Sequence, residues 1–382
     1  MERLIYLDNS ATTRPCEEAV RAAEYAMREQ FGNPSSLYGV GLAAENLVSA
    51  ARAAIADRLC CREDEIFFTS CGSESNNTAV FGAAQLLRRR GRHIVTTAVE
   101  HPSVLEPVKR LEEQGYEVTR IQPDSDGSIP AERFAEAIRP DTVLVSCMYV
   151  NNEVGAIYPV AKLKKRITEK QSPALLHIDC VQAFGKLNID AGLLGADLIT
   201  LSAHKIHGLK GAGALYVRKG LHLPSLILGG GQEKGLRSGT EAVPAISAFG
   251  AAAEALPALS AQYSGAQEIY DYCRAGLGAF ENAVINSPEN GLPFILNFSF
   301  LGYRSETLLH YLEQYGICVS SGSACSRGQG SHVLRAMGLE QARVDSALRL
   351  SFSRETKKEE IDALLTALKG ALSLKKSGRQ RR

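Results

Sequence analysis

Strand-like and helix-like segments alternate from about residue 15 to residue 240 of this chain. Short apolar runs are typical of buried strands, and apolar residues three or four apart are typical of helices. Alternation of the two predicts an α/β fold, with a mostly parallel seven-stranded sheet covered by helices on both faces. The predicted strands are residues 66–69, 94–97, 116–121, 142–149, 174–178, 197–201 and 214–217.

The pattern changes after about residue 256, where fewer and more widely spaced elements follow. We predict a large domain over residues 15–255 and a smaller α+β domain made of residues 1–14 and 256–374. Residues 356–359 read Thr-Lys-Lys-Glu, a capping box that would open the last helix. Residues 375–382 are basic and lack apolar side chains, so we expect a disordered, solvated tail there.

Composition excludes several function classes. The net charge is +1, which gives no electrostatic case for binding nucleic acid or a membrane surface. No apolar run approaches the roughly 20 residues that span a bilayer. The nine cysteines are irregularly spaced without a CxxC pair, and their odd number in a large chain argues against a disulfide framework. We expect no resident metal. We therefore expect a cytoplasmic enzyme with two domains.

Two charged residues end neighbouring apolar runs. Asp179 closes one run, and Lys205 closes the next, just before a glycine-rich stretch. A lysine that loses water at a strand end has a lowered pKa, and a neutral amine can form a Schiff base with an aldehyde. Pyridoxal phosphate requires such a lysine, together with an acid for its ring nitrogen. Taken singly, Lys205 is more often a solvated loop residue and Asp179 a cap.

An anion site is the second requirement of pyridoxal phosphate. Residues 69–75 join a strand to a helix, Gly72 allows close backbone approach, and Ser73 offers a hydroxyl. Helix N-termini bind phosphate because their first amides are unpaired. Simple helix capping by these serines is an equally good reading of the segment alone. Residues 237–240 form a second polar cluster that could donate to the same phosphate.

Further polar residues follow other predicted strands. His101 could stack on a cofactor ring and move protons near neutral pH. Asn152 and Gln182 could hydrogen-bond a ring hydroxyl. Ligands of open α/β sheets gather at the carboxyl ends of strands. Together with Asp179 and Lys205, these residues converge on the same end of the sheet, and the set as a whole predicts one cofactor site.

Cys325 stands apart from the other cysteines because it lies among small polar residues. An exposed thiol near Arg327 can supply the nucleophilic thiolate, although an adventitious surface cysteine is the alternative. Arg349, on the next predicted strand, could grip a substrate carboxylate or form a surface ion pair. Cys147 and Cys180 lie in apolar runs and should be small core residues.

With these motifs in place, the chain resembles the cysteine desulfurases of the NifS/IscS-like branch of the class V aminotransferase family. The resemblance covers nearly the whole chain. The segments that carry it are residues 6–13 (YLDNSATT), 31–35 (FGNPS), 97–101 (TAVEH), 150–155 (VNNEVG), 177–182 (HIDCVQ), 202–205 (SAHK), 237–240 (RSGT) and 320–325 (SSGSAC).

The resemblance implies a fold-type-I homodimer that carries pyridoxal phosphate on Lys205. Asp179 would hold the ring-nitrogen proton, His101 would stack on the ring, and Thr240 would reach the phosphate of the other subunit. Asn33 and Arg349 would hold the substrate carboxylate. The remaining implied cofactor contacts are Gly72, Ser73, Asn152, Gln182, Ser202 and His204.

The implied reaction removes sulfur from L-cysteine to give L-alanine and a persulfide on Cys325. An acceptor protein would then take the sulfur for iron–sulfur cluster assembly or tRNA thiolation, and Cys325 could contact a cluster or iron on a scaffold partner. Alternatives are a selenocysteine lyase, another lyase or transaminase on the same cofactor, and a sulfur-relay subunit without turnover. The segment after Cys325 is shorter than in better-known members, and no extended scaffold-docking tail follows the last helix, which leaves the partner open.

Overall fold

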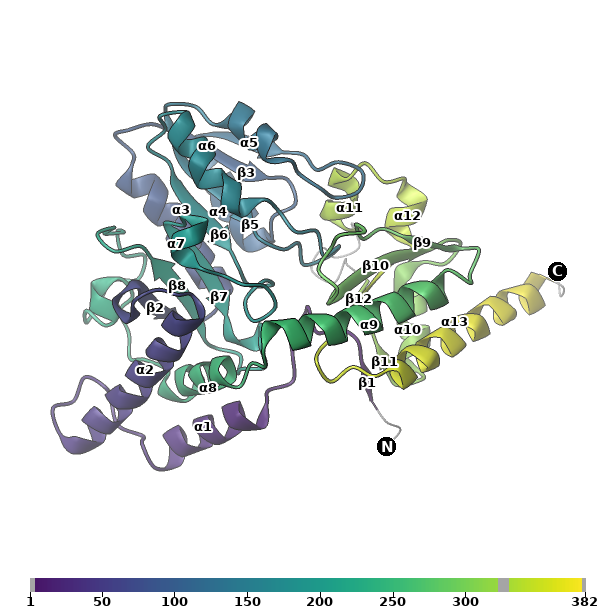
Figure 1. The fold of residues 1–382 in the computed structure, drawn as a ribbon, viewed down its shortest axis with the longest axis horizontal. Helices are drawn as coiled ribbons and strands as arrows, with labels where there is room; N and C mark the ends of the chain where they lie inside the picture. The colour runs from purple at the N-terminus through teal and green to yellow at the C-terminus, as the bar shows by residue number, and fades with distance from the viewer. Residues whose placement is uncertain (1–3, 322–329, 380–382) are drawn as a thin grey trace.

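The central feature of the computed structural model, which describes residues 4–321 and 330–379, is a seven-stranded sheet (Figure 1). Four of its six strand pairings are parallel, and β8 runs antiparallel to both of its neighbours. In spatial order the strands are β2 (Ile66–Thr69), β8 (Gly213–Val217), β7 (Leu198–Ser202), β6 (Leu175–Asp179), β5 (Thr142–Met148), β3 (His93–Thr97) and β4 (Glu117–Ile121).

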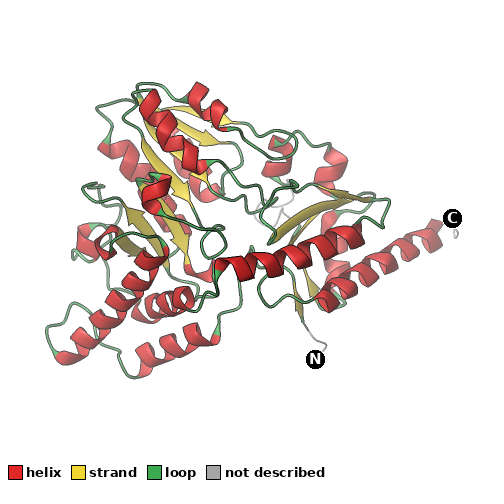
Figure 2. Ribbon diagram, viewed as in Figure 1, coloured by secondary structure: helices red, strands yellow, loops and turns green. Residues whose placement is uncertain are grey.

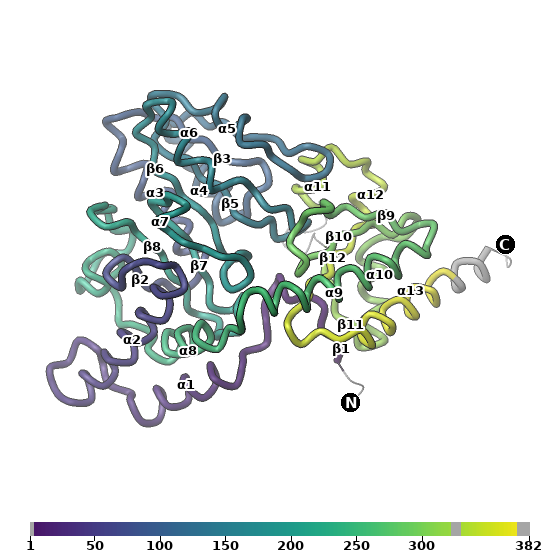
Figure 3. The backbone as a smooth tube through the Cα atoms, viewed as in Figure 1, coloured from purple at the N-terminus to yellow at the C-terminus, as the bar shows by residue number. Residues whose placement is uncertain are grey.

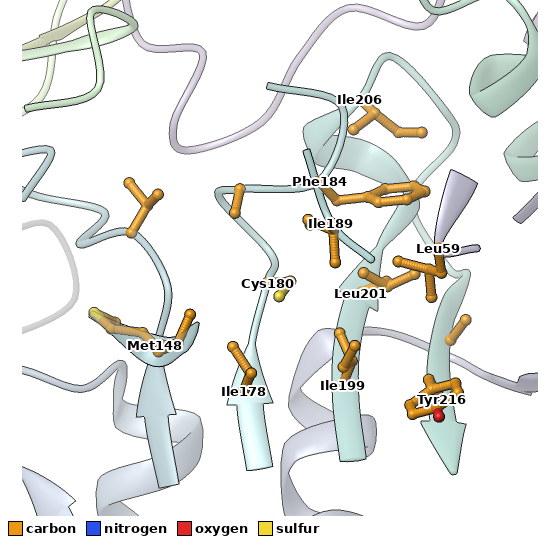
Figure 4. Close-up of a cluster of buried hydrophobic side chains, with 14 of the residues drawn as sticks. Leu59, Met148, Ile178, Cys180, Phe184, Ile189, Ile199, Leu201, Ile206 and Tyr216 are labelled. Atoms are coloured by element: carbon orange, nitrogen blue, oxygen red, sulfur yellow. The ribbon is translucent and has the colours of Figure 1, made fainter. Parts of the chain in front are cut away.

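Side chains of this sheet pack alternately on its two faces. Along β7, Leu198 joins one hydrophobic cluster, whereas Ile199 and Leu201 join the other. Figure 4 shows Ile178, Ile199 and Tyr216 side by side on adjacent strands of the larger cluster. Because successive side chains point to opposite faces, burial on both sides requires the nearly continuous apolar runs seen in the sequence.

Helices cover both faces (Figure 2). Apolar residues of α3 (Gly72–Leu86) and α4 (Pro102–Glu113) belong to the smaller cluster. The larger cluster takes apolar residues from helices that surround the other face. These are α1 (Glu17–Arg28), α2 (Gly39–Arg58), α5 (Ala131–Ala137), α6 (Leu163–Glu169), α7 (Ala191–Leu194) and α8 (Val243–Glu254).

The rest of the chain builds two small sheets with a hydrophobic cluster of their own. β10 (Ile295–Phe300) lies between β12 (Ala347–Ser351) and β9 (Ala283–Ile285), antiparallel to both. At the start of the chain, β1 (Ile5–Tyr6) pairs in parallel with β11 (Ile317–Cys318). The helices of this part are α9 (Leu259–Leu277), α10 (Ser305–Glu313), α11 (His332–Ala336), α12 (Gln341–Asp345) and α13 (Lys358–Arg379). Figure 3 shows β1 and α13, the first and last described elements, on this side of the molecule.

The predicted α/β class and the seven strands are confirmed, with strand ends shifted by at most one residue. The predicted capping box is wrong in register. Thr356 accepts a hydrogen bond from the backbone of Ser353, the helix begins at Lys358, and Glu360 accepts from the backbone of Lys357. Helix α13 runs to Arg379, five residues into the segment for which we expect a disordered tail.

The division into two domains stays a prediction. Hydrophobic packing crosses the predicted boundary between them. Leu292, Phe294 and Val333, which follow residue 256, pack in the cluster of the large sheet. Side chains of the two parts therefore share a core.

No single helix among the described residues is long and apolar enough to cross a membrane, and α8 and α9 meet that criterion only together, across a bend of 84°.

Candidate active site

A pocket of about 380 Å³ opens where strands β5, β6 and β7 reach their carboxyl ends. Segments from the start, middle and end of the chain line it, so the fold brings together residues that are far apart in sequence. Most of the predicted site residues lie in its lining: Gly72, Ser73, His101, Asn152, Asp179, Gln182, Ser202, His204, Lys205 and Arg349.

Lys205 lies in a 3-10 turn, Ala203–Lys205, directly after β7. Its Nζ donates to the main-chain oxygens of Ser10 at 2.5 Å and Ala11 at 2.8 Å. The amine is half-buried, and its partners come from a segment almost two hundred residues earlier. The N-terminal segment therefore completes the surroundings of the predicted cofactor lysine.

Asp179 ends β6 and is almost completely buried. Its Oδ2 accepts from the side-chain amide of Asn76 at 2.8 Å, and its Oδ1 accepts from the backbone of Val181 at 2.9 Å. These two donors hold the carboxylate in one orientation at the pocket wall. Sequence reasoning missed Asn76, which lies one turn into α3; its place on the helix after the predicted anion turn is the signal that could have found it.

His101 caps α4, and its Nδ1 accepts a hydrogen bond from the backbone of Ser103 at 3.1 Å. Burial lowers the pKa of His101, the charges of Lys205 and His332 lower it further, and Asp179 acts in the opposite direction. A neutral ring that accepts at Nδ1 carries its proton on Nε2. Burial lowers the pKa of His204 to about 4, and the charge of Lys205 is the largest charge that acts in the same direction.

The first turn of α3 forms a candidate anion site. Cys71 precedes the helix without a side-chain cap, so the first amides of this 15-residue helix remain available. A Cβ added at Gly72 would lie 2.9 Å from a methyl group of Val181, so a larger residue would push against the wall. The buried hydroxyl of Ser202 has no hydrogen-bond partner among the described residues. We call Gly72, Asn76, Asp179, Ser202 and Lys205 the sheet wall.

A second part of the lining centres on Arg349, which is buried on β12. Its guanidinium pairs with the carboxylate of Asp8 at 2.7 Å and donates to the main-chain oxygen of Asn152 at 3.0 Å. The ion pair is therefore in the pocket and not on the surface. Sequence reasoning missed Asp8, since a partner 341 residues away leaves no local signal. We call Asp8, Ser320, His332 and Arg349 the arginine wall.

Glu153 and His332 are two further lining residues that sequence reasoning missed. Glu153 is buried, accepts from the hydroxyl of Ser331, and lies 3.8 Å from Nδ1 of His332. Burial raises the pKa of Glu153, while the hydrogen bond from Ser331 and the charge of His332 act against that rise. The position of Glu153 one residue after Asn152 was the available signal.

Two predicted residues, Asn33 and Thr240, are not brought into this pocket. Asn33 is exposed in the loop between α1 and α2, where its Oδ1 accepts from the backbone of Ser35. Thr240 is exposed and lines a separate pocket with Arg237. Cys325 lies outside the described residues. Cys147 and Cys180 are fully buried, as predicted, and burial raises their thiol pKa values well above the ordinary range.

Comparison with known proteins identifies the family. The family model described as Aminotransferase class-V matches residues 5–364. The chain belongs to the class V aminotransferase family. Cysteine desulfurase 2 of Trichormus variabilis is 42% identical over 366 residues, which is 95% of this chain and 91% of that protein.

Solved structures agree with this membership of the class V aminotransferases. A NifS-like protein superposes with a TM-score of 0.92 at 38% identity, over 97% of this chain and all of that one. A structure described as SspA in complex with cysteine superposes with a TM-score of 0.82 at 34% identity, over 92% and 99% of the two chains. The likeness to the NifS-like structure and to the cysteine desulfurase of Trichormus variabilis places this class V aminotransferase in the NifS/IscS-like branch, among the cysteine desulfurases.

The class V aminotransferases use pyridoxal phosphate, and the sheet wall fits that group. An acid–amine pair, Asp179 and Lys205, lines one pocket together with an uncapped helix N-terminus. The unpartnered hydroxyl of Ser202 can serve an added acceptor. Gly72 has no side chain to cover its backbone, at a position where a Cβ would crowd Val181. The residues of the sheet wall therefore fit pyridoxal phosphate in the positions in which the structure holds them.

Proposed function

We propose that this chain is a cysteine desulfurase that binds pyridoxal phosphate, removes sulfur from L-cysteine, releases L-alanine and forms a persulfide on Cys325. One observation carries the proposal. Ser320, just before the segment that contains Cys325, and His332, just after it, both line the pocket that holds Lys205 and Asp179. The described residues on either side of the segment that contains Cys325 therefore border the pocket.

When bound, the cofactor would supply an aldehyde for the substrate amine and a ring that stabilises negative charge next to that amine. Lys205 is proposed to hold the cofactor and then, as a free amine, to take the proton from the substrate α-carbon. Asn76 and Val181 fix the carboxylate of Asp179, which would accept the hydrogen bond of the ring nitrogen. The first turn of α3 and Ser73 would hold the phosphate.

The arginine wall is proposed to bind the substrate. Arg349 donates two of its hydrogen bonds to Asp8 and Asn152, which fixes the guanidinium plane and leaves donors for a carboxylate. The thiolate of Cys325 attacks the substrate sulfur, so that an S–S bond forms as the C–S bond breaks. The carbon that loses sulfur takes up a proton, the α-carbon regains the proton that Lys205 removed, and alanine leaves.

A homodimer is part of the proposal. Large apolar side chains are exposed around the loop that contains Asn33, including Phe31 at 74%, Leu37 at 103% and Tyr38 at 66%. A cluster of this kind marks a protein–protein interface. A second copy that covers this surface would give Asn33 and Thr240, which lie outside the pocket of their own chain, a place in a partner's pocket. The proposed setting is the cytoplasm.

The sulfur acceptor stays a prediction: a scaffold for iron–sulfur clusters or an enzyme that thiolates tRNA. A selenocysteine lyase differs from the proposed activity in substrate, and a transaminase differs in product, because it would release a keto acid. A relay subunit would accept persulfide without consuming cysteine.

The experiment is to incubate the purified protein, loaded with pyridoxal phosphate, with L-cysteine and to measure alanine, keto acid and sulfide. Alanine in equal amount to transferred sulfur supports desulfuration. Keto acid as the product would favour transamination, and a protein that accepts persulfide but never forms alanine would favour the relay. The same assay with selenocysteine distinguishes the lyase by its ratio of kcat/KM values.

A further inference from the structure

A second lysine, Lys186, lies behind the pocket wall, in the turn that follows β6. Its Nζ lies 3.3 Å from the side-chain oxygen Oε1 of Gln182 and 3.3 Å from the main-chain oxygen of the same residue. It also lies 5.9 Å from the centre of the Phe294 ring. Among the described residues no carboxylate forms an ion pair with Lys186. Both of its hydrogen-bond contacts go to Gln182.

Gln182 connects this lysine to the cofactor lysine. Its side-chain nitrogen Nε2 donates to the main-chain oxygen of Ser10 at 3.0 Å. The same oxygen accepts from Nζ of Lys205. Lys186, Gln182, Ser10 and Lys205 therefore form one hydrogen-bonded chain, and Gln182, Ser10 and Lys205 line the pocket.

Donor and acceptor chemistry decides how the amide of Gln182 must point. An ammonium group has three donors and no acceptor, and a neutral amine still has one N–H for each of the two Gln182 oxygens that Lys186 faces. In either state Lys186 donates to the oxygen of the amide. The nitrogen then faces Ser10 and the pocket, and since an amide nitrogen has two protons, one remains after the bond to Ser10. The main-chain oxygen of Ser10, which can only accept, selects the same orientation, so Lys186 and Ser10 hold the amide from its two ends.

We propose that Lys186 is a positioning residue that fixes the amide of Gln182 with its nitrogen toward the pocket, so that Gln182 donates to an oxygen on the ring of pyridoxal phosphate. The proposal rests on the proposed function for the identity of the cofactor. Burial and the charge of Lys205 lower the pKa of Lys186 to about 7, so this lysine is held in place at a cost to folding. Such a cost is typical of a residue kept for function.

The test measures the affinity of the full-length apo protein for pyridoxal phosphate by absorbance titration. Lys186→Met removes the donor but keeps a similar side-chain volume, and we expect about tenfold weaker binding, the loss of one oriented hydrogen bond. Lys109→Met, at an exposed position on α4, is the matched control and should bind the cofactor as the unchanged protein does.

A double-mutant cycle separates positioning from general damage. Because Lys186 acts through Gln182, Lys186→Met should add less than about twofold to the loss already caused by Gln182→Ala. An equal loss in both backgrounds would overturn the proposal, as would unchanged affinity of the single variant. The apo protein with Lys186→Met should melt at the same or a higher temperature, whereas a structural lysine would lower its Tm.

Gln182→Glu keeps the test decisive if Lys186→Met fails to fold. A glutamate at this position can pair with Lys186 but has no N–H to donate, so we expect the same tenfold loss of cofactor affinity. Cofactor binding equal to that of the unchanged protein would show that no donor is needed there. Failure of the proposed function would look different: no alanine would form from cysteine, while the affinity cycle would keep its pattern.

Discussion

The sheet wall and the arginine wall of the pocket are built in different ways. Asp179 and Ser202 end neighbouring parallel strands, and backbone hydrogen bonds fix their positions. Asp8 and Arg349 meet across 341 residues, from a short N-terminal segment and a strand of the second part of the chain. We infer a division of labour, in which the sheet wall holds the cofactor and the arginine wall holds the substrate.

The largest expected effect is at the sheet wall. Lys205→Ala removes the amine that is proposed to hold the cofactor and move the α-proton, so alanine formation should fall at least about 10³-fold. The absorption band of the protein-linked cofactor should be lost with it. Survival of that band, measured on the purified variant, would contradict the role of Lys205.

A large but different effect is expected at the arginine wall. Arg349→Ala should raise the KM for L-cysteine by roughly 10- to 100-fold, because charge-assisted hydrogen bonds to the substrate carboxylate are lost. The cofactor spectrum should stay unchanged, since the sheet wall is intact. Steady-state kinetics together with absorbance test this, and loss of the cofactor in this variant would break the division between the two walls.

Asp8→Asn should give a smaller effect of the same kind. The amide keeps the shape of Asp8 but loses its charge, so Arg349 is held less firmly and the KM for cysteine should rise by up to about fivefold. The value of kcat should stay nearly constant. A change in kcat without a change in KM would show that Asp8 acts on the chemistry and not on substrate binding.

The smallest effect expected concerns stability under the sheet wall. His177 is fully buried between the hydroxyls of Ser146 and Thr200, and burial lowers its pKa to about 4. Between pH 6.5 and about 4 the unfolded chain binds a proton that the folded chain does not, so the folded state loses stability as the pH falls through this range. Urea unfolding of His177→Gln should show a weaker decline, and an unchanged pH slope would contradict it.

The comparison also explains what the sequence could predict. Asp179, Ser202 and Lys205 stand at the ends of apolar runs. The end of such a run is a local signal, because it predicts both the strand and the edge of the sheet at which the residue lies. The places of Asn76, Asp8 and His332 in the pocket depend on how a helix is rotated or on contacts between distant parts of the chain. A short stretch of sequence does not contain that information. Gly72 at the first turn of α3 and the buried Arg349 are intermediate cases. Their residue types indicated a role in binding, but the sequence did not show which residues they contact.

The most direct measurement is to treat the cofactor-loaded protein with L-cysteine and map added sulfur on all nine cysteines by mass spectrometry. Cys71, which also lines the pocket, is the competing thiol. The account predicts one added sulfur atom on the peptide with Cys325, none on the peptide with Cys71, and neither persulfide nor alanine turnover in Cys325→Ser. Persulfide on Cys71, or release of sulfide by Cys325→Ser at the unchanged rate, would contradict it.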